Sequence, residues 1–333
     1  MAPIDRRVRL WAWLLSRQAI ASKTEPQIVA MQRRRTPSNA IANRIFGRIA
    51  PGTQASDRSI PGPAGHIAVR VYRPASGSRG PRPLVLNFHG GGFVFGDLRL
   101  SDWVCSNVAM TVGAVVVSVD YRLAPMHRFP AAVEDAYAAL VWAASNAADL
   151  GAADFGGGEA GEARPPRIGV MGESAGGNLA AVLCLLARDR GGPAISHQAL
   201  LYPVVDMTGS RSVRASAGSL ILSLPEMLAF RRLYLGDADP RDALASPLLA
   251  ADHGGLPQAL IQVAEHDPLR DEGAAYAHAL RAAAVPVRLS EYVGMPHGYI
   301  NFPGICRAAP QALAELCAEQ AAALLEPAVV ADR

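Results

Sequence analysis

The sequence predicts an α/β fold in which a mostly parallel, twisted sheet is flanked by helices, and three observations carry this prediction. Short apolar runs alternate with stretches of helical spacing along most of the chain. One of these runs passes directly into a helix through a serine-centred turn. The 333 residues, half of them hydrophobic, are enough to bury the large core that such a fold needs.

The first elements are expected before the serine turn. Residues 66–73 alternate apolar and polar side chains, which is typical of an edge strand. Apolar runs at 84–88 and 115–119 predict buried strands, and the helical spacing of 102–112 between them predicts a parallel β-α-β crossover. A long, Ala-rich helix is expected at 130–148.

The alternation continues in the second half of the chain. A Gly/Pro-rich loop at 151–166 is expected to precede the strand that leads to the serine. The later predicted segments are strand 167–171, helix 178–187, strand 198–202, strand 259–264, helix 271–284, strand 287–293 and helix 310–325.

Two regions lack this alternation and predict a helical lid. Residues 1–50 alternate apolar and basic positions at helical spacing, with breaks at Pro26 and Pro37, so two or three short helices are expected. A Met/Leu/Phe-rich helical stretch at 225–235 follows the loss of rhythm after residue 204. The expected organisation is a first cap segment at 1–50, core at 51–204, a second cap segment at 205–245 and core at 246–333.

The net charge of +3 is unevenly distributed, and the excess of basic residues is in an N-terminal arm. Residues 1–60 contain 11 Lys and Arg against 3 Asp and Glu. The simplest interpretation is a solvated helical face, and an anchor to a membrane surface or to nucleic acid is the alternative. Because the arm lacks the interleaved aromatics or zinc spacing of nucleic-acid binders, no nucleic-acid partner is expected.

Cysteine usage and the N-terminal apolar run indicate the compartment. The apolar run at 10–15 is cut short by Arg17, too soon for export or for spanning a bilayer. A cytoplasmic enzyme without stable membrane insertion is therefore expected. No C-x-x-C pair is present, so the four cysteines are predicted to be reduced and mostly buried. They are Cys105, Cys184, Cys306 and Cys317.

The serine turn predicts a nucleophile. Ser174 follows a strand and precedes a helix, with Gly172 and Gly176 two residues away on either side, which is the G-x-S-x-G pattern in its required setting. The glycines are expected because a Cβ at either position would clash in so tight a turn. A serine hydroxyl is a weak nucleophile, so it needs a histidine base, which in turn needs a carboxylate.

Candidates for the acid and the base follow two later strands. Asp267 comes directly after the strand at 259–264, and His297 comes after the strand at 287–293 between a proline and a glycine. Both should emerge at the same edge of the sheet as Ser174. Glu265 is the alternative acid, whereas Asp271 and Glu272 are assigned to the start of a helix.

A glycine run predicts an oxyanion hole. Gly90, Gly91 and Gly92 follow a buried strand and His89, so their backbone N–H groups can approach a substrate closely. The amide of Ala175, directly after the serine, would supply a further donor.

Together these residues resemble the hormone-sensitive-lipase-like (bacterial family IV) esterases of the α/β-hydrolase superfamily, over residues 60–325. The matching segments are His89-Gly-Gly-Gly-Phe93, Asp120-Tyr-Arg-Leu-Ala-Pro125, Phe129-Pro-Ala-Ala-Val-Glu-Asp135, Gly172-Glu-Ser-Ala-Gly-Gly-Asn178, Asp267-Pro-Leu-Arg-Asp-Glu272 and His297-Gly298. The resemblance implies an α/β-hydrolase fold with a helical cap, and it implies that Arg122 forms a structural ion pair. It also implies a triad of Ser174, Asp267 and His297 and an oxyanion hole formed by Gly91, Gly92 and Ala175.

The expected activity is that of a serine carboxylesterase for short- to medium-chain acyl esters, acting through an acyl-enzyme. No cofactor or metal is expected, the partner is a small-molecule ester, and a homodimer is possible. The confined, apolar pocket behind this preference would be formed by Trp11, Trp13, Met227 and Phe230. An amidase or deacetylase with the same triad and a non-catalytic receptor on the same fold are the alternatives.

Overall fold

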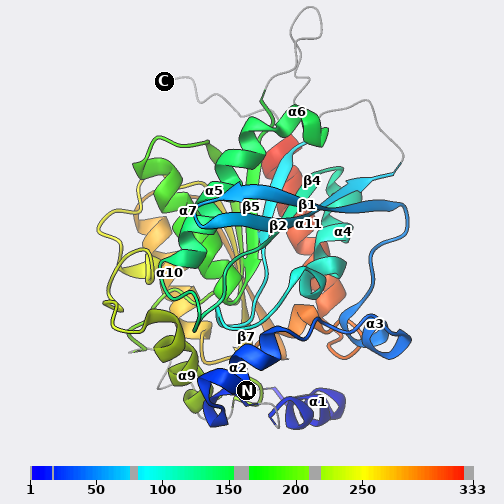
Figure 1. The fold of residues 1–333 in the computed structure, drawn as a ribbon, viewed down its shortest axis with the longest axis vertical. Coiled ribbons are helices and arrows are strands. Elements are labelled where there is room, and N and C mark those ends of the chain that lie inside the picture. Colours follow the sequence, from blue (N-terminus) through cyan, green and yellow to red (C-terminus); the bar gives the residue numbers. More distant parts are fainter. Residues whose placement is uncertain (1, 17–18, 76–81, 154–164, 210–218, 326–333) are drawn as a thin grey trace, which may run out of the picture.

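The computed structural model describes residues 2–16, 19–75, 82–153, 165–209 and 219–325, and its centre is a single sheet of eight strands. The strands are β1 (Thr53–Gly62), β2 (Gly65–Pro74), β3 (Leu84–Phe88), β4 (Val115–Asp120), β5 (Ile168–Glu173), β6 (Ile195–Leu201), β7 (Gln258–His266) and β8 (Val287–Pro296). Their order across the sheet is β1-β2-β4-β3-β5-β6-β7-β8. β2 is antiparallel to both of its neighbours, and all other pairs are parallel. The predicted mostly parallel sheet is confirmed (Figure 1).

The described helices cover the sheet and one of its ends. The α-helices are α1 (Arg6–Ser16), α2 (Glu25–Gln32), α3 (Ala40–Phe46), α4 (Asp102–Val112), α5 (Ala131–Ser145), α6 (Ala147–Leu150), α7 (Ala175–Asp189), α9 (Leu224–Leu235), α10 (Arg270–Ala282) and α11 (Ala309–Leu325). Four short 3-10 helices are η1 (Ile20–Ser22), η2 (Leu98–Ser101), η3 (Pro247–Leu249) and η4 (Tyr299–Asn301). Strand 84–88 and helix 102–112 have the predicted bounds, whereas the helix predicted at 130–148 is divided at Asn146. Most of the loop predicted at 151–166 lies outside the described residues.

The edge of the sheet is where the sequence-based prediction is wrong. The strand predicted at residues 66–73 is β2, but it lies inside the sheet because β1 pairs with it along its whole length, from Thr53 opposite Pro74 to Gly62 opposite Gly65. β1 is the edge strand, and Ile60 is its only buried residue. Without an apolar alternation it gives no strand signal in the sequence.

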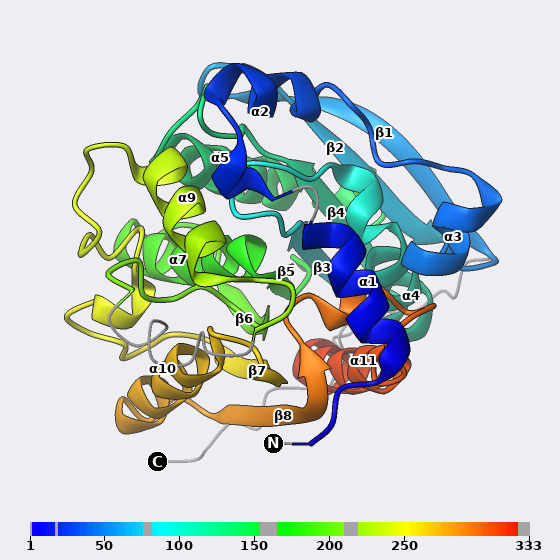
Figure 2. The same cartoon turned by 90° about the horizontal axis from the view of Figure 1, so that it is seen from below.

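Alternating side chains of the central strands are buried in two separate hydrophobic cores, one on each face of the sheet. In β4, Val115 and Val117 point to one face, which α5, α7 and α10 cover, while Val116 points to the other face, which α4 and α11 cover (Figure 2). Because both faces are covered, the strand ends are fixed, and the loops that follow them start from a rigid frame.

The helices α1, α2, α3 and α9, called the cap helices below, lie together at the lower end of Figure 1 and cross in front of the strands in Figure 2. Their contacts place them over the carboxyl ends of the strands. The side-chain amide of Gln32 donates to the carbonyls of Val94 and Ala124, which follow β3 and β4. Glu226 of α9 accepts the amides of Ile20 and Ala21, which joins the two cap segments.

Other expectations from the sequence concern side chains. Arg122 forms the expected ion pair, with 2.8 Å between its Nη2 and the Oδ1 of buried Asp135. All four cysteines are free and buried. No helix in the part of the chain that the structure describes combines the length and apolar character needed to cross a membrane.

Candidate active site

Ser174 occupies a tight turn between β5 and α7. Its φ of 55° and ψ of −114° are strained for a residue with a side chain. The turn is held by the Ser174 amide, which donates to the carbonyl of Leu201 on β6 at 2.8 Å. A Cβ at Gly172 would collide with the backbone of Gly176, and a Cβ at Gly176 would collide with the carbonyl of Phe88. Both glycines are therefore required, for the steric reason that the sequence suggested.

A histidine and a carboxylate from two other strand ends meet this serine. The Oγ of Ser174 lies 2.9 Å from Nε2 of His297, and Nδ1 of His297 lies 2.7 Å from Oδ2 of Asp267. The other oxygen of Asp267 accepts the amide of Leu269 at 2.9 Å, which orients the carboxylate. With Nδ1–H donating to Asp267, Nε2 can accept the hydroxyl proton of Ser174. The structure thus brings together the three residues that the sequence singled out.

Glu265, the alternative acid, has a different set of partners. Its carboxylate accepts the amides of Ala2 and Gly294, each at 2.8 Å. These two hydrogen bonds lower the pKa of Glu265. The carboxylate therefore ties the N-terminal segment to the end of β8, while Asp267 makes the direct contact with the imidazole.

The predicted oxyanion donors lie at the end of β3 and at the start of α7. Gly91 and Gly92 have φ values of 118° and 61°, in the region that favours glycine. A Cβ at Gly91 would collide with the carbonyl of Phe95, so the turn admits no side chain there. Ala175 is the first residue of α7, where a backbone N–H has no partner within its own helix.

His89 anchors this glycine turn. Its Nδ1 lies 2.8 Å from the carbonyl of Gly90, and its ring stacks on Tyr121 with 4.3 Å between the centroids. The hydroxyl of Tyr121 donates to the His89 carbonyl at 2.7 Å. Burial lowers the pKa of His89, so its ring is neutral at pH 7 and serves as a fixed spacer.

Glu173 is a residue of the site that the sequence reasoning missed. Its side chain is fully buried beneath the glycine turn, where it accepts the Gly90 amide at 3.2 Å and the Ser101 hydroxyl at 3.3 Å. Burial raises the pKa of Glu173 to about 8. An acidic residue at the end of an otherwise apolar buried strand was the signal that could have found it.

The side chains of Ser174 and His297 are almost entirely buried. Ser174 and His297 each retain 8% of their surface. Phe230 of α9 lies so close to Gly92 that a Cβ there would meet its ring, and it also contacts Phe95 with 5.7 Å between ring centroids. Trp13, which the sequence placed in the pocket, is instead mostly exposed on α1, so that expectation is wrong.

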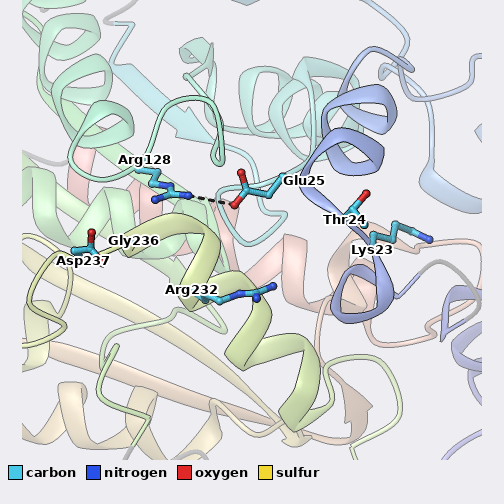
Figure 3. Close-up of a pocket in the computed structure, with 7 residues that line it drawn as sticks. All are labelled: Lys23, Thr24, Glu25, Arg128, Arg232, Gly236 and Asp237. Carbon is cyan, nitrogen blue, oxygen red and sulfur yellow. Dashed lines mark hydrogen bonds and ion pairs between the residues drawn. The ribbon is translucent and has the colours of Figure 1, made fainter.

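A separate polar recess of about 460 Å³ opens between the cap and the core (Figure 3). Its lining comes from the segment before α2, the loop at Arg128 and the end of α9. Arg128 and Glu25 form an ion pair across it at 3.2 Å, and Arg232 and Lys23 lie further along. It contains none of the three residues that meet at Ser174. Nor do the described residues contain a group of three His, Cys, Asp or Glu side chains suited to hold a metal.

Comparisons with known proteins show the family of this chain. A sequence model of the α/β-hydrolase fold matches residues 85–301, a stretch that contains every residue of the proposed site. The chain belongs to the hormone-sensitive-lipase-like family of α/β-hydrolases. The resemblance that the sequence suggested is thereby confirmed.

Proteins named as esterases are among the relatives of this hydrolase. The carboxylic ester hydrolase LipN of Mycobacterium tuberculosis is 47% identical over 269 residues, which cover 78% of this chain and 68% of LipN. An arylesterase of Saccharolobus solfataricus is 31% identical over 92% of this chain and 95% of its own. Among solved structures, an esterase of Pyrobaculum calidifontis superposes with a TM-score of 0.81 at 39% identity, covering 95% of this chain and 98% of that one.

Proposed function

We propose a mechanism by which this chain, a carboxylic ester hydrolase, forms an acyl-enzyme on Ser174. The observation that carries the proposal is the continuous hydrogen-bonded series from the Ser174 hydroxyl through His297 to Asp267. A serine on a strained turn, in contact with an imidazole that a buried carboxylate orients, is the arrangement that acyl transfer requires.

The chemistry proceeds in two halves. Nε2 of His297 takes the Ser174 proton while Oγ attacks the ester carbon, and the tetrahedral intermediate collapses as His297 returns the proton to the leaving alcohol. Water then attacks the acyl-enzyme in the same way, and the acid is released. Asp267 keeps Nδ1 protonated and stabilises the imidazolium that forms in each half.

The developing oxyanion is assigned to the amides of Gly91, Gly92 and Ala175. Support comes from the two positive φ angles, which favour glycine, and from the position of Ala175 at the start of α7. Glu173 contributes by holding the Gly90 amide from below, so that the following peptides keep their orientation. It touches no reacting atom, so it is a positioning residue.

The preferred substrates in this proposal are esters of short to medium acyl chains. Phe230 and Phe95 lie over the glycine turn, and Ser174 is nearly covered, so a long chain has little space near the reacting atoms. Rates on p-nitrophenyl acetate, butyrate, octanoate and palmitate test this. The rates should peak at the short chains, and equal turnover of palmitate would contradict the confined site.

The same residues could in principle cleave an amide, so the bond is tested separately. An ester and an amide with the same acyl group and the same aromatic leaving group should be compared at matched concentrations. We expect the ester to be cleaved with a kcat/KM at least about 10²-fold higher than that of the amide. An amide turned over equally fast would assign the natural reaction to amide hydrolysis.

A further inference from the structure

Helix α1 is apolar on two faces, one of them buried and the other exposed. Val8 and Ala12 are buried, and Trp11 packs against Phe46 and Phe302 with ring centroids 6.2 Å and 5.5 Å away. The opposite face carries three large apolar side chains at helical spacing. These are Leu10, Trp13 and Leu14, which are 61%, 52% and 42% exposed. An ordinary surface helix would carry polar residues at these positions.

The exposed apolar side chains gather at the cap end of the molecule. Among the described residues, eleven large hydrophobic side chains are exposed, and seven of them lie on the cap helices or on loops after strand ends. Besides the three on α1, these are Ile41 on α3, Phe95 after β3, Met126 after β4 and Leu228 on α9. Scattered single residues need no explanation, but a concentration at one end marks an interaction surface.

Basic side chains lie beside the stripe on α1. Arg6 and Arg9 precede Leu10 and Trp13 by four residues, so each lies one turn away on the same side of the helix. Both are exposed, as are Arg7 and the run at residues 33–35 that follows α2. An apolar stripe rimmed by arginines and containing a tryptophan fits the boundary between headgroups and acyl chains of an anionic bilayer.

We propose that the cap end docks on an anionic lipid surface, with Leu10, Trp13 and Leu14 entering the interface and the surrounding arginines contacting lipid phosphates. The positive charge of this region is the reason to choose an anionic bilayer over a second copy of the chain, which would bring like charges together. In this orientation the end that carries Ser174 faces the bilayer. Esters that partition into the membrane would then be presented to the enzyme without passing through bulk water.

The test measures binding, so its outcome is independent of the catalytic mechanism. The full chain is sedimented with phosphatidylcholine vesicles that contain either no phosphatidylglycerol or about one third of it. The bound fraction should be at least about tenfold greater on the anionic vesicles and should fall as salt is raised from about 0.1 M to 0.5 M. No binding to the anionic vesicles would overturn the proposal.

Two double variants and two matched controls locate the surface. Leu10→Gln with Leu14→Gln, and Arg6→Glu with Arg9→Glu, should each reduce vesicle binding about tenfold. The controls change exposed residues elsewhere in the same way: Val141→Gln with Leu325→Gln, and Arg190→Glu with Arg281→Glu. The controls should bind as the wild type does, and equal losses in controls and test variants would overturn the assignment to α1.

Two further readouts complete the test. Turnover of soluble p-nitrophenyl acetate without vesicles should be unchanged in all four variants, because none of the substituted residues contacts the Ser174 site. The second readout is the apparent mass of the protein in solution at several protein concentrations, which tests whether a second copy of the chain covers this face instead. A dimer that dissociates in the Leu10→Gln, Leu14→Gln variant and binds no vesicles would show that a second copy covers this face, and would contradict the proposal.

Discussion

The turn around Ser174 and helix α1 both lie at the carboxyl end of the sheet, yet they are held in different ways. Around Ser174 the constraints are in the backbone: Gly172 and Gly176 admit no Cβ, and the serine amide is hydrogen-bonded to β6. Helix α1 packs on the protein through the side chains of Val8, Trp11 and Ala12, while Leu10 and its neighbours remain exposed.

This difference separates the chemistry from access to it. Positions set by backbone contacts cannot adjust, which suits groups that must stay within tenths of an ångström of a reacting atom. Positions set by side chains can be altered one at a time. We therefore expect substitutions around Ser174 to abolish turnover and substitutions in the cap to change selectivity, stability or binding.

The largest effect is expected at the three hydrogen-bonded residues. Ser174→Ala should lower kcat by about 10⁶-fold and Asp267→Asn by about 10⁴-fold, because the nucleophile or the histidine tautomer is lost. Glu265→Gln should stay within about tenfold, since it contacts backbone amides and not His297. Steady-state rates on p-nitrophenyl butyrate measure the effects of all three substitutions, and Ser56→Ala on the exposed edge strand is the control. A larger loss in Glu265→Gln than in Asp267→Asn would reverse the assignment of the acid.

The next largest effect is expected in the glycine turn after β3, where a side chain added at Gly92 would meet a side chain and one added at Gly91 would meet the backbone. Gly92→Ala should lower kcat/KM by about 10²-fold, because its Cβ meets the Phe230 ring and displaces an oxyanion donor. Adding Phe230→Ala should restore much of that loss, since the obstructing group is a side chain of the cap.

The matched pair at the preceding glycine should behave differently. Gly91→Ala should be as damaging, and adding Phe95→Ala should restore nothing, because the collision is with the carbonyl of Phe95. Rescue of both double variants to the same extent would show that the two glycines are not constrained in different ways.

A third effect concerns stability and pH. The pKa of Glu173 is raised from its ordinary value of 4.5 to about 8, so between these values the folded state binds one more proton than the unfolded state. The stability that depends on this proton is fully present below about pH 4.5 and is lost as pH rises to about 8. A glutamine does not titrate, so Glu173→Gln does not lose this stability. Its free energy of unfolding should therefore rise by about 3 kcal/mol relative to that of the wild type between pH 5 and pH 8.

Urea unfolding at several pH values measures this difference. The control is Glu291→Gln, in which an exposed carboxyl is neutralised, and its stability should follow that of the wild type across the range. A constant difference between Glu173→Gln and wild type from pH 5 to pH 8 would contradict a raised pKa for Glu173.

The smallest effect compares two tryptophans on α1. Trp11→Ala should cost about 2 kcal/mol of stability, because its contacts with Phe46 and Phe302 are lost. Trp13→Ala, two residues away and on the exposed face, should cost less than about 1 kcal/mol. Thermal or urea unfolding of both variants measures these losses of stability. Equal losses would contradict the description of α1 as having a buried and an exposed face.

The same contrast explains what the sequence could predict. The strands and helices of the core carry clear apolar patterns, and the order serine, acid, histidine at the ends of three strands singles out Ser174, Asp267 and His297. β1 could not be predicted because Ile60 is its only buried residue, so it is a strand through its pairing with β2 and not through apolar burial.

Other features depend on contacts that no local pattern records. Glu265 lies at the end of β7 and Asp267 directly follows the strand, so the choice between them is decided by which carboxylate reaches the imidazole. The role of Glu173 depends on the glycine turn folding over it. Helix α1 is apolar on both sides, so its sequence does not tell which tryptophan packs inward.

The most direct test of the central claim is the intact mass of the protein after exposure to an alkyl phosphonate ester probe. Wild type should gain one adduct, mapped to the peptide that contains Ser174, and should lose turnover of p-nitrophenyl butyrate in the same proportion. Ser174→Ala should gain no adduct and show no burst. An adduct on another residue, or full activity after complete labelling of Ser174, would contradict the assignment of Ser174 as the nucleophile.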